Sequence, residues 1–354
     1  MTSLDEAIAA VEAAADDAEQ RRCIPEPALE ALRGLGVNRM LLPAELGGSE
    51  TPVADVIDTL AAIGAADGST AWCASIASGS KVFAGYLPRP VAAEVFARPD
   101  DGAAGVFAAL GTYKEGRLSG RWPFTSNCLH SSWIGMGAFV EGDPVPRLFF
   151  LPADQVTVHE TWDTSGLCAT GSHDVSVDDV AVGLDYSCSF LDGPWAAGDM
   201  WRMPLFTVLA PCLVAGLVGV ARGAVDQVLA HLPDDPVHLA ELAAADSAIQ
   251  AAHAALVVNA QHITALAAEG IRADRRTQAR SMLAVQHACD TAVEVVSTAH
   301  RLGGGRAAYS SSRLLRSLRD VHAGRQHVAF SHRHRPVLAR ILAGSEEMAP
   351  PLVI

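Results

Sequence analysis

The order in which helical and strand-like patterns follow one another is what most constrains the fold of this 354-residue chain. Apolar residues recur at helical spacing through roughly the first hundred positions. Near Gly102 the pattern changes to short alternating runs between turn residues, which predict a small antiparallel sandwich or barrel. After Trp201 the spacing is helical again. We therefore predict an α+β protein with three domains: an N-terminal helical domain, 1–103; a central β-domain, 104–195; and a C-terminal four-helix bundle, 196–354.

Charge and composition exclude several kinds of partner. A formal net charge of −14 argues against nucleic acid, because phosphate binding needs a basic surface. The seven cysteines include no CxxC pair, which is typical of reduced thiols in a cytoplasmic protein. The uncharged run Met203–Ala221 is long enough to span a bilayer, but prolines and glycines interrupt it and it stands alone. We interpret this run as a buried helix and expect no membrane partner.

Five segments, in the same order along the chain, resemble the acyl-CoA dehydrogenase superfamily. More narrowly, they resemble its flavin-dependent monooxygenase branch, the oxygenase components of two-component systems. The residues that carry this resemblance are Ile24–Gly48, Asp67–Ala77 (DGSTAWCASIA), Gly116–Ala138, Trp162–Val182 and His300–His327. No single motif is decisive, but five in this order make coincidence a poor explanation.

The resemblance implies an activity and its partners. Members of this branch use reduced flavin, FADH2 or FMNH2, with O2 as cosubstrate, to oxygenate a small aromatic or heteroaromatic molecule through a C4a-(hydro)peroxyflavin. A separate flavin reductase supplies the reduced flavin, and the absence of an NAD(P)H-binding motif from this chain agrees with that. Family likeness also implies a homotetramer built on the C-terminal bundle.

The segment WPFTS at Trp122–Ser126 is the first candidate site. From the residues alone, Thr125 and Ser126 could simply satisfy backbone groups at a turn. The resemblance implies that they contact the N5 and O4 edge of the flavin beside an aromatic residue, here Phe124. A hydroxyl both donates and accepts, so it suits N5 with or without a proton. Trp72 is either core packing or a wall of the same pocket.

Four histidines gather in Arg319–His334, namely His322, His327, His332 and His334. Spacings of five and two residues do not put a pair on one helix face, so we predict no metal site. We interpret His332 and His334 as solvated residues near a helix end.

His327 is the predicted catalytic residue, together with Ser126. Acyl-CoA dehydrogenases carry a catalytic glutamate about eight residues after an Arg-Asp pair, and here that position is Val328, which cannot take a proton. The resemblance implies that the neighbouring His327 lies near the flavin, where an imidazole can act as acid or base around neutrality. The alternative is a helical histidine bonded to a nearby carbonyl.

The flavin phosphates are harder to place. Dehydrogenases grip the diphosphate with an Arg-x-Thr-Phe-Gly segment, whereas this chain has the acidic LPDDPVHLAEL, which would repel it. Either an arginine such as Arg280 substitutes, or the chain binds FMN or a weakly held, exchanged flavin. The turn Gly303-Gly304-Gly305 is a helix break, and in the family a Gly-Gly turn lies near the flavin of a neighbouring subunit.

Three other interpretations concern chemistry of a different kind. Ser172, His173 and Asp174 cannot form a relay if they are adjacent in a strand, so we interpret them as a turn entering a strand. The chain could instead be an acyl-CoA dehydrogenase with a displaced base, for which Glu346 and Glu347 are candidates. It could also be a flavin-free partner subunit of a hetero-oligomer.

Overall fold

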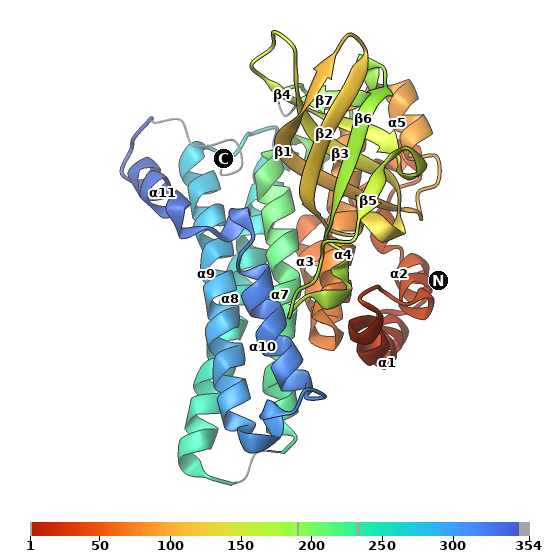
Figure 1. The fold of residues 1–354 in the computed structure, drawn as a ribbon. Helices are drawn as coiled ribbons and strands as arrows, with labels where there is room; N and C mark the ends of the chain where they lie inside the picture. The colour runs from red at the N-terminus through yellow and green to blue at the C-terminus, as the bar shows by residue number, and fades with distance from the viewer. Residues whose placement is uncertain (1, 190, 232–233, 347–354) are drawn as a thin grey trace.

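The computed structural model describes residues 2–189, 191–231 and 234–346, and it has the predicted order of helices, sheet and helices (Figure 1). The N-terminal helices are α1 (Leu4–Arg21), α2 (Glu26–Leu35), α3 (Val53–Ala66), α4 (Gly68–Lys81) and α5 (Arg89–Val95). The strands are β1 (Gly102–Lys114), β2 (Arg117–Thr125), β3 (Ser131–Val140), β4 (Pro146–Pro152), β5 (Thr157–His159), β6 (His173–Ala181) and β7 (Ser187–Ser189). The C-terminal helices are α6 (Asp199–Arg202), α7 (Leu205–Leu229), α8 (Pro236–Ala268), α9 (Arg275–Leu302), α10 (Arg313–Gly324) and α11 (Arg335–Leu342).

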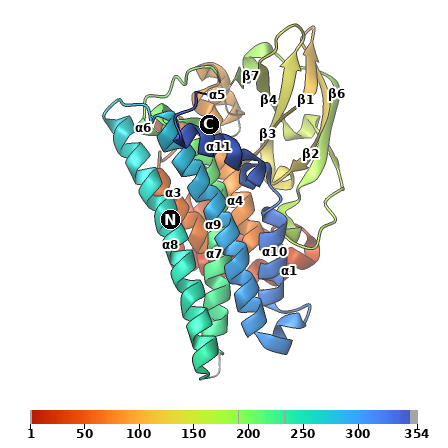
Figure 2. The same cartoon turned by 90° about the vertical axis from the view of Figure 1, so that its left-hand side faces the viewer.

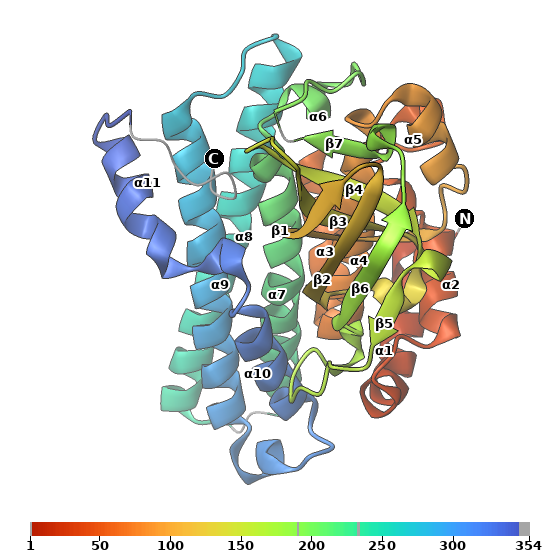
Figure 3. The same cartoon turned by 45° about the horizontal axis from the view of Figure 1, so that its top comes forward.

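The seven strands form one sheet in the order β5-β6-β2-β1-β3-β4-β7. The α+β class is confirmed, but the prediction of wholly antiparallel pairing is wrong for one pair, because β1 and β3 run parallel. The reason is the chain path. After the β1–β2 hairpin, the chain crosses to the other side of β1, so β3 runs in the same direction as β1. Figure 3 shows α3 and α4 behind this sheet, and α4 contacts β1.

Helix α4 owes its start to Asp67, whose carboxylate accepts the backbone N–H of Thr70 at 2.7 Å as an N-cap. Its neighbour α3 lies unusually close to α7 because glycines face the contact. A Cβ on Gly64 would stand 2.2 Å from the carbonyl oxygen of Gly216, and one on Gly219 would stand 2.0 Å from that of Ala61. The glycines therefore let the N-terminal helices and the bundle share one core.

Helices α7, α8, α9 and α10 run side by side as the C-terminal bundle (Figure 2). Within the described residues, α7 alone is long and apolar enough to cross a membrane, yet 78% of its most apolar window is buried inside the protein. This is the position of Met203–Ala221, and the prediction of a buried helix is confirmed there. The predicted helix break at Gly303 to Gly305 is also present, since α9 ends at Leu302.

Helix α10 is fastened to α1 by a row of arginines. Arg313 pairs with Glu12, and Arg316 pairs with Asp16 at 2.6 Å and with Glu19 at 3.2 Å. The helix ends at Gly324, and short turns follow it, η9 (Val328–Phe330) and η10 (His332–His334). The interpretation of His327 as a helical residue is therefore wrong, because this segment leaves the helix three residues before it.

Candidate active site

Trp72, Ser126 and His327 meet although they come from three distant parts of the sequence. The indole Nε1–H of Trp72 on α4 donates to Ser126 Oγ, just after β2, at 3.0 Å. The rings of Trp72 and His327 pack edge to face with centroids 5.6 Å apart, and Phe330 packs against both. Trp72 is thus a core residue that also links the two predicted catalytic residues.

Phe124 stands out through its backbone. The pairing of β2 with β6 shifts register between Trp122 and Thr125, which marks a bulge. Phe124 has φ of 64°, a conformation that costs a bulky residue energy, and its side chain is 71% exposed against the edge of Trp162. An exposed aromatic held in a strained bulge points to a ligand-facing role.

His327 is neutral over the ordinary pH range. Desolvation among packed aromatic rings lowers the pKa of His327 to about 4. Its Nδ1 accepts the backbone N–H of Ala329 at 3.3 Å, so the ring proton of the neutral form belongs on Nε2. The ring therefore accepts a hydrogen bond from a backbone amide. Within the described residues it is not bonded to a carbonyl oxygen, which was the alternative interpretation.

The turn that carries His327 is held by Asp290 on α9. Its carboxylate accepts the Nε–H of Arg325 at 3.0 Å, lies 3.0 Å from His332 Nε2 and pairs with Arg335. His334 Nε2 lies 3.1 Å from the carbonyl oxygen of Val328. His332 is exposed, as expected of a solvated residue, and His334 is half-buried; both also bond to groups of this turn or its support.

Ser172 and Thr170 join the site although the sequence interpretation missed them. Ser172 Oγ lies 2.7 Å from Ser126 Oγ and 2.6 Å from Thr170 Oγ1. Ser172 immediately precedes β6, and the neighbouring His173 instead accepts two backbone N–H groups through Nδ1. Ser172, His173 and Asp174 therefore do not form a hydrogen-bonded relay, as expected. The signal that could have found Ser172 was its place opposite Ser126 across the paired strands.

Asp320 anchors the loop that carries Thr170. Its Oδ1 accepts the backbone N–H of Leu167 at 2.6 Å, and a Cβ on Gly166 would stand 2.1 Å from the carbonyl oxygen of Arg319. Two effects raise the pKa of Asp320 to about 8: desolvation by burial is the larger, and repulsion from the nearby Asp67 carboxylate is the second. This buried carboxyl is therefore mostly protonated at neutral pH.

Other predicted residues lie apart. The side chain of Thr125 is fully covered, and its hydroxyl donates to the carbonyl oxygen of Trp122 at 3.4 Å. Arg280 is near the start of α9, while Gly303 and Gly304 follow its end, about 34 Å away at 1.5 Å per residue. Arg280 and this turn of the same chain therefore cannot both contact the phosphates of one flavin.

The acidic loop before α8 is committed to its own helix. The carboxylate of Asp235 caps α8 by accepting the backbone N–H of Val237 at 2.8 Å and of His238 at 3.2 Å. These bonds lower the pKa of Asp235, which therefore keeps its negative charge at the helix N-terminus. Leu232 and Pro233 of the same loop lie outside the described residues. This end of α8 is closed to a phosphate.

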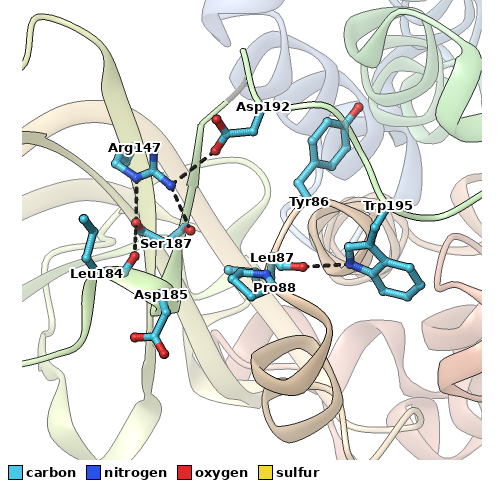
Figure 4. Close-up of a pocket in the computed structure, with 9 residues that line it drawn as sticks. All are labelled: Tyr86, Leu87, Pro88, Arg147, Leu184, Asp185, Ser187, Asp192 and Trp195. Atoms are coloured by element: carbon cyan, nitrogen blue, oxygen red, sulfur yellow. Dashed lines mark hydrogen bonds and ion pairs between the residues drawn. The ribbon is translucent and has the colours of Figure 1, made fainter.

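Two pockets help to delimit the site. A pocket of about 430 Å³ opens beside β7 and is lined by none of the predicted site residues (Figure 4). A pocket of about 230 Å³ is lined by Cys73 and Asn127, which directly follow Trp72 and Ser126 in sequence. Glu346 is exposed beyond α11, and Glu347 lies outside the described residues. Neither pocket is lined by Trp72, Ser126 or His327, so the site is assigned from the contacts among these three side chains.

The residues present fit the ring system of a flavin. An isoalloxazine needs apolar surface for its rings and hydrogen-bonding groups for its polar edge. Phe124 and Val328 supply exposed apolar surface, and Ser126, which keeps 8% of its surface exposed, supplies a hydroxyl. His327 supplies an N–H. These side chains would hold the ring system, whereas the predicted phosphate-binding residues lie elsewhere on the chain.

Comparison with known proteins agrees with this fold from end to end. The family model "Acyl-CoA dehydrogenase, C-terminal domain" matches residues 211–332. The chain is 31% identical to indole-3-acetate monooxygenase of Pseudomonas putida, over 87% of this chain and 84% of that protein. It is 27% identical to the flavin-dependent monooxygenase oxygenase subunit HsaA of Rhodococcus jostii over 99% of both. The crystal structure of 3-HSA hydroxylase from Rhodococcus sp. RHA1 matches with a TM-score of 0.94 at 26% identity, over 99% of this chain and 98% of that one.

Proposed function

The chain belongs to the flavin-dependent monooxygenase branch of the acyl-CoA dehydrogenase superfamily, and we propose that Trp72, Phe124, Ser126 and His327 form its active site. It is the oxygenase component of a two-component system that uses reduced flavin, O2 and a separate reductase. The convergence of Trp72, Ser126 and His327 carries the site assignment. We further propose cytoplasmic localisation.

Each residue of the proposed site has a distinct task. Reduced flavin, when bound, supplies the electrons that activate O2. Ser126 bonds the polar edge of the ring system, and Phe124 and Val328 cover its apolar part and exclude water. His327 offers its Nε2 proton to oxygen or substrate atoms, since Nδ1 is already occupied. Arg280 would act toward the phosphates, whereas the Gly303-Gly304 turn, at the other end of α9, would lie near the flavin of a neighbouring subunit.

We propose a small aromatic or heteroaromatic substrate. The rings of Trp72, His327 and Phe330 are packed together at the site, and edge-to-face packing with such rings favours a flat, aromatic ligand. The names of relatives point the same way, since they include indole-3-acetate monooxygenase and a resorcinol hydroxylase oxygenase component.

An oxygen-isotope assay tests the function. The purified protein, chemically reduced FMN or FAD, and ¹⁸O2 are mixed with aromatic compounds such as indole-3-acetate and resorcinol. We expect a product with one ¹⁸O atom, and none when oxidised flavin replaces reduced flavin. Bound flavin that an acyl-CoA bleaches would instead indicate a dehydrogenase. Failure to bind flavin in either redox state would indicate a flavin-free subunit.

We also propose a homotetramer assembled on the outer face of α8. This helix lies at the edge of the bundle (Figure 2), and Val258 on its exposed side is 61% exposed. Alanines share that side, namely Ala240, Ala243, Ala244, Ala248, Ala251 and Ala254. A helix that is apolar on its solvent side usually packs against a partner.

Val258→Glu is therefore expected to break the tetramer, because a charge would be buried at the contact. Light scattering after size-exclusion chromatography measures the mass. Ala13→Glu, at an exposed position on α1, is the matched control and should leave the mass unchanged. An unchanged mass for the Val258 variant would exclude this face from the interface.

A further inference from the structure

Four polar side chains form one continuous chain of hydrogen bonds beneath the proposed site. Trp72 Nε1 bonds Ser126 Oγ at 3.0 Å, Ser126 bonds Ser172 at 2.7 Å, and Ser172 bonds Thr170 at 2.6 Å. The chain ends where Thr170 Oγ1 donates to the carbonyl oxygen of Leu167 at 2.9 Å. Ser172 and Thr170 are 3% and 1% exposed, so water has little access to these hydroxyls.

The two ends give this chain a direction. An indole N–H only donates, and a backbone carbonyl only accepts. All bonds are satisfied together when each hydroxyl passes its hydrogen onward from Ser126 to Ser172, then to Thr170, and finally to Leu167. In that arrangement the Ser126 hydroxyl donates its hydrogen to Ser172 and accepts the N–H of Trp72. One lone pair on its oxygen remains to accept a hydrogen bond from a ligand.

We propose that Ser172 and Thr170 make the site selective for reduced over oxidised flavin by holding Ser126 as a hydrogen-bond acceptor. This inference rests on the proposed contact between Ser126 and the flavin N5 edge. Reduced flavin carries a hydrogen on N5 and donates it, whereas oxidised flavin offers only a lone pair there. An acceptor at Ser126 therefore matches the reduced form.

Binding of oxidised flavin requires the chain to reverse. Ser126 would turn its hydrogen to N5, Ser172 would donate to Ser126, and Thr170 would donate to Ser172. The bond from Thr170 to the Leu167 carbonyl would then be lost. One neutral hydrogen bond corresponds to roughly two- to tenfold in a ratio of affinities. Such a bias suits a protein that must take up reduced flavin and release the oxidised form.

Thr170→Val is the sharpest test, because valine keeps the shape and removes the hydroxyl. Without an acceptor at Thr170, Ser172 donates to Ser126, and the hydrogen of Ser126 turns toward the ligand. We expect the ratio of dissociation constants, oxidised over reduced flavin, to fall by about fivefold or more. Ser172→Ala should lower the ratio less, because Ser126 is then free to turn either way. Anaerobic titration of FMN and of dithionite-reduced FMN measures both constants.

Thr207→Val is the matched control. Thr207 is equally buried and also donates to a carbonyl three residues earlier, that of Pro204, but it lies outside the chain of bonds. Its ratio should equal that of the unchanged protein, and thermal melting checks that every variant is folded.

Ser126→Ala separates the two proposals. If Ser126→Ala weakens flavin binding but Thr170→Val and Ser172→Ala leave the ratio unchanged, the site stands and the inferred selectivity is overturned. If Ser126→Ala changes neither dissociation constant, the flavin contact itself is overturned, and the selectivity falls with it. A lower ratio in the Thr170 variant, with an unchanged ratio in the Thr207 variant, supports the inference.

Discussion

Replacement of His327 by alanine is expected to lower the rate of substrate oxygenation by more than about tenfold while the fold stays intact, as expected when a hydrogen-bond donor to the reacting oxygen atoms is lost. The ring packs against Trp72 and Phe330, and its Nδ1 accepts the N–H of Ala329, so Nε2–H is the group available to ligands. His327→Gln keeps a side-chain N–H donor and should retain more activity than the alanine variant. Product formation with chemically reduced flavin measures both.

His322→Ala is the control, because His322 is exposed on the last turn of α10 and lies outside the site. Desolvation holds the pKa of His327 near 4, so the ring is neutral from about pH 5 upward. A plot of activity against pH should therefore have the same shape near pH 6.5 in the unchanged protein and in the glutamine variant. Equal activity of the alanine variant and the unchanged protein would remove His327 from the mechanism.

Replacement of Asp320 by asparagine is expected to reduce the loss of stability as pH rises from about 4 to about 8. The folded chain raises the pKa of Asp320 to about 8, so the folded state keeps a proton that the unfolded state releases near pH 4. Stability from this group therefore falls as pH rises between those two values. Asparagine mimics the protonated acid, since its carbonyl accepts the N–H of Leu167 and its amide carries no charge.

Between pH 5 and pH 9, the unchanged protein should lose on the order of a few kcal/mol more unfolding free energy than the asparagine variant. Melting temperatures at the two pH values measure it. The melting temperature of the unchanged protein should fall more between pH 5 and pH 9 than that of the Asp320→Asn variant. Asp274→Asn is the control. Asp274 caps α9, and its bonds with Thr277 lower its pKa, so it is ionised in both states above pH 5. Parallel losses in the Asp320 variant and the unchanged protein would contradict a protonated Asp320.

Local pattern accounts for most of the fold. The helix start at Asp67, the buried run that became α7 and the break after Leu302 all depend on neighbouring residues, and each could be predicted. The parallel pairing of β1 with β3 could not, because it depends on where the chain crosses after β2. The end of α10 at Gly324 was missed for a similar reason, since contacts with Asp290 on α9 hold the turn that follows.

The sequence by itself determined the family, the order of helices, sheet and bundle, and the candidates Ser126 and His327. The order of elements follows from periodicity, whereas the family and the two candidates follow from a resemblance that five segments carry in order along the chain. Only the tertiary structure decided that Trp72 joins Ser126 to His327, and that Ser172 and Thr170 support Ser126 from beneath. It also decided which ring nitrogen of His327 is available. The reason is physical: hydrogen-bond direction and desolvation depend on distances between segments that lie far apart along the chain.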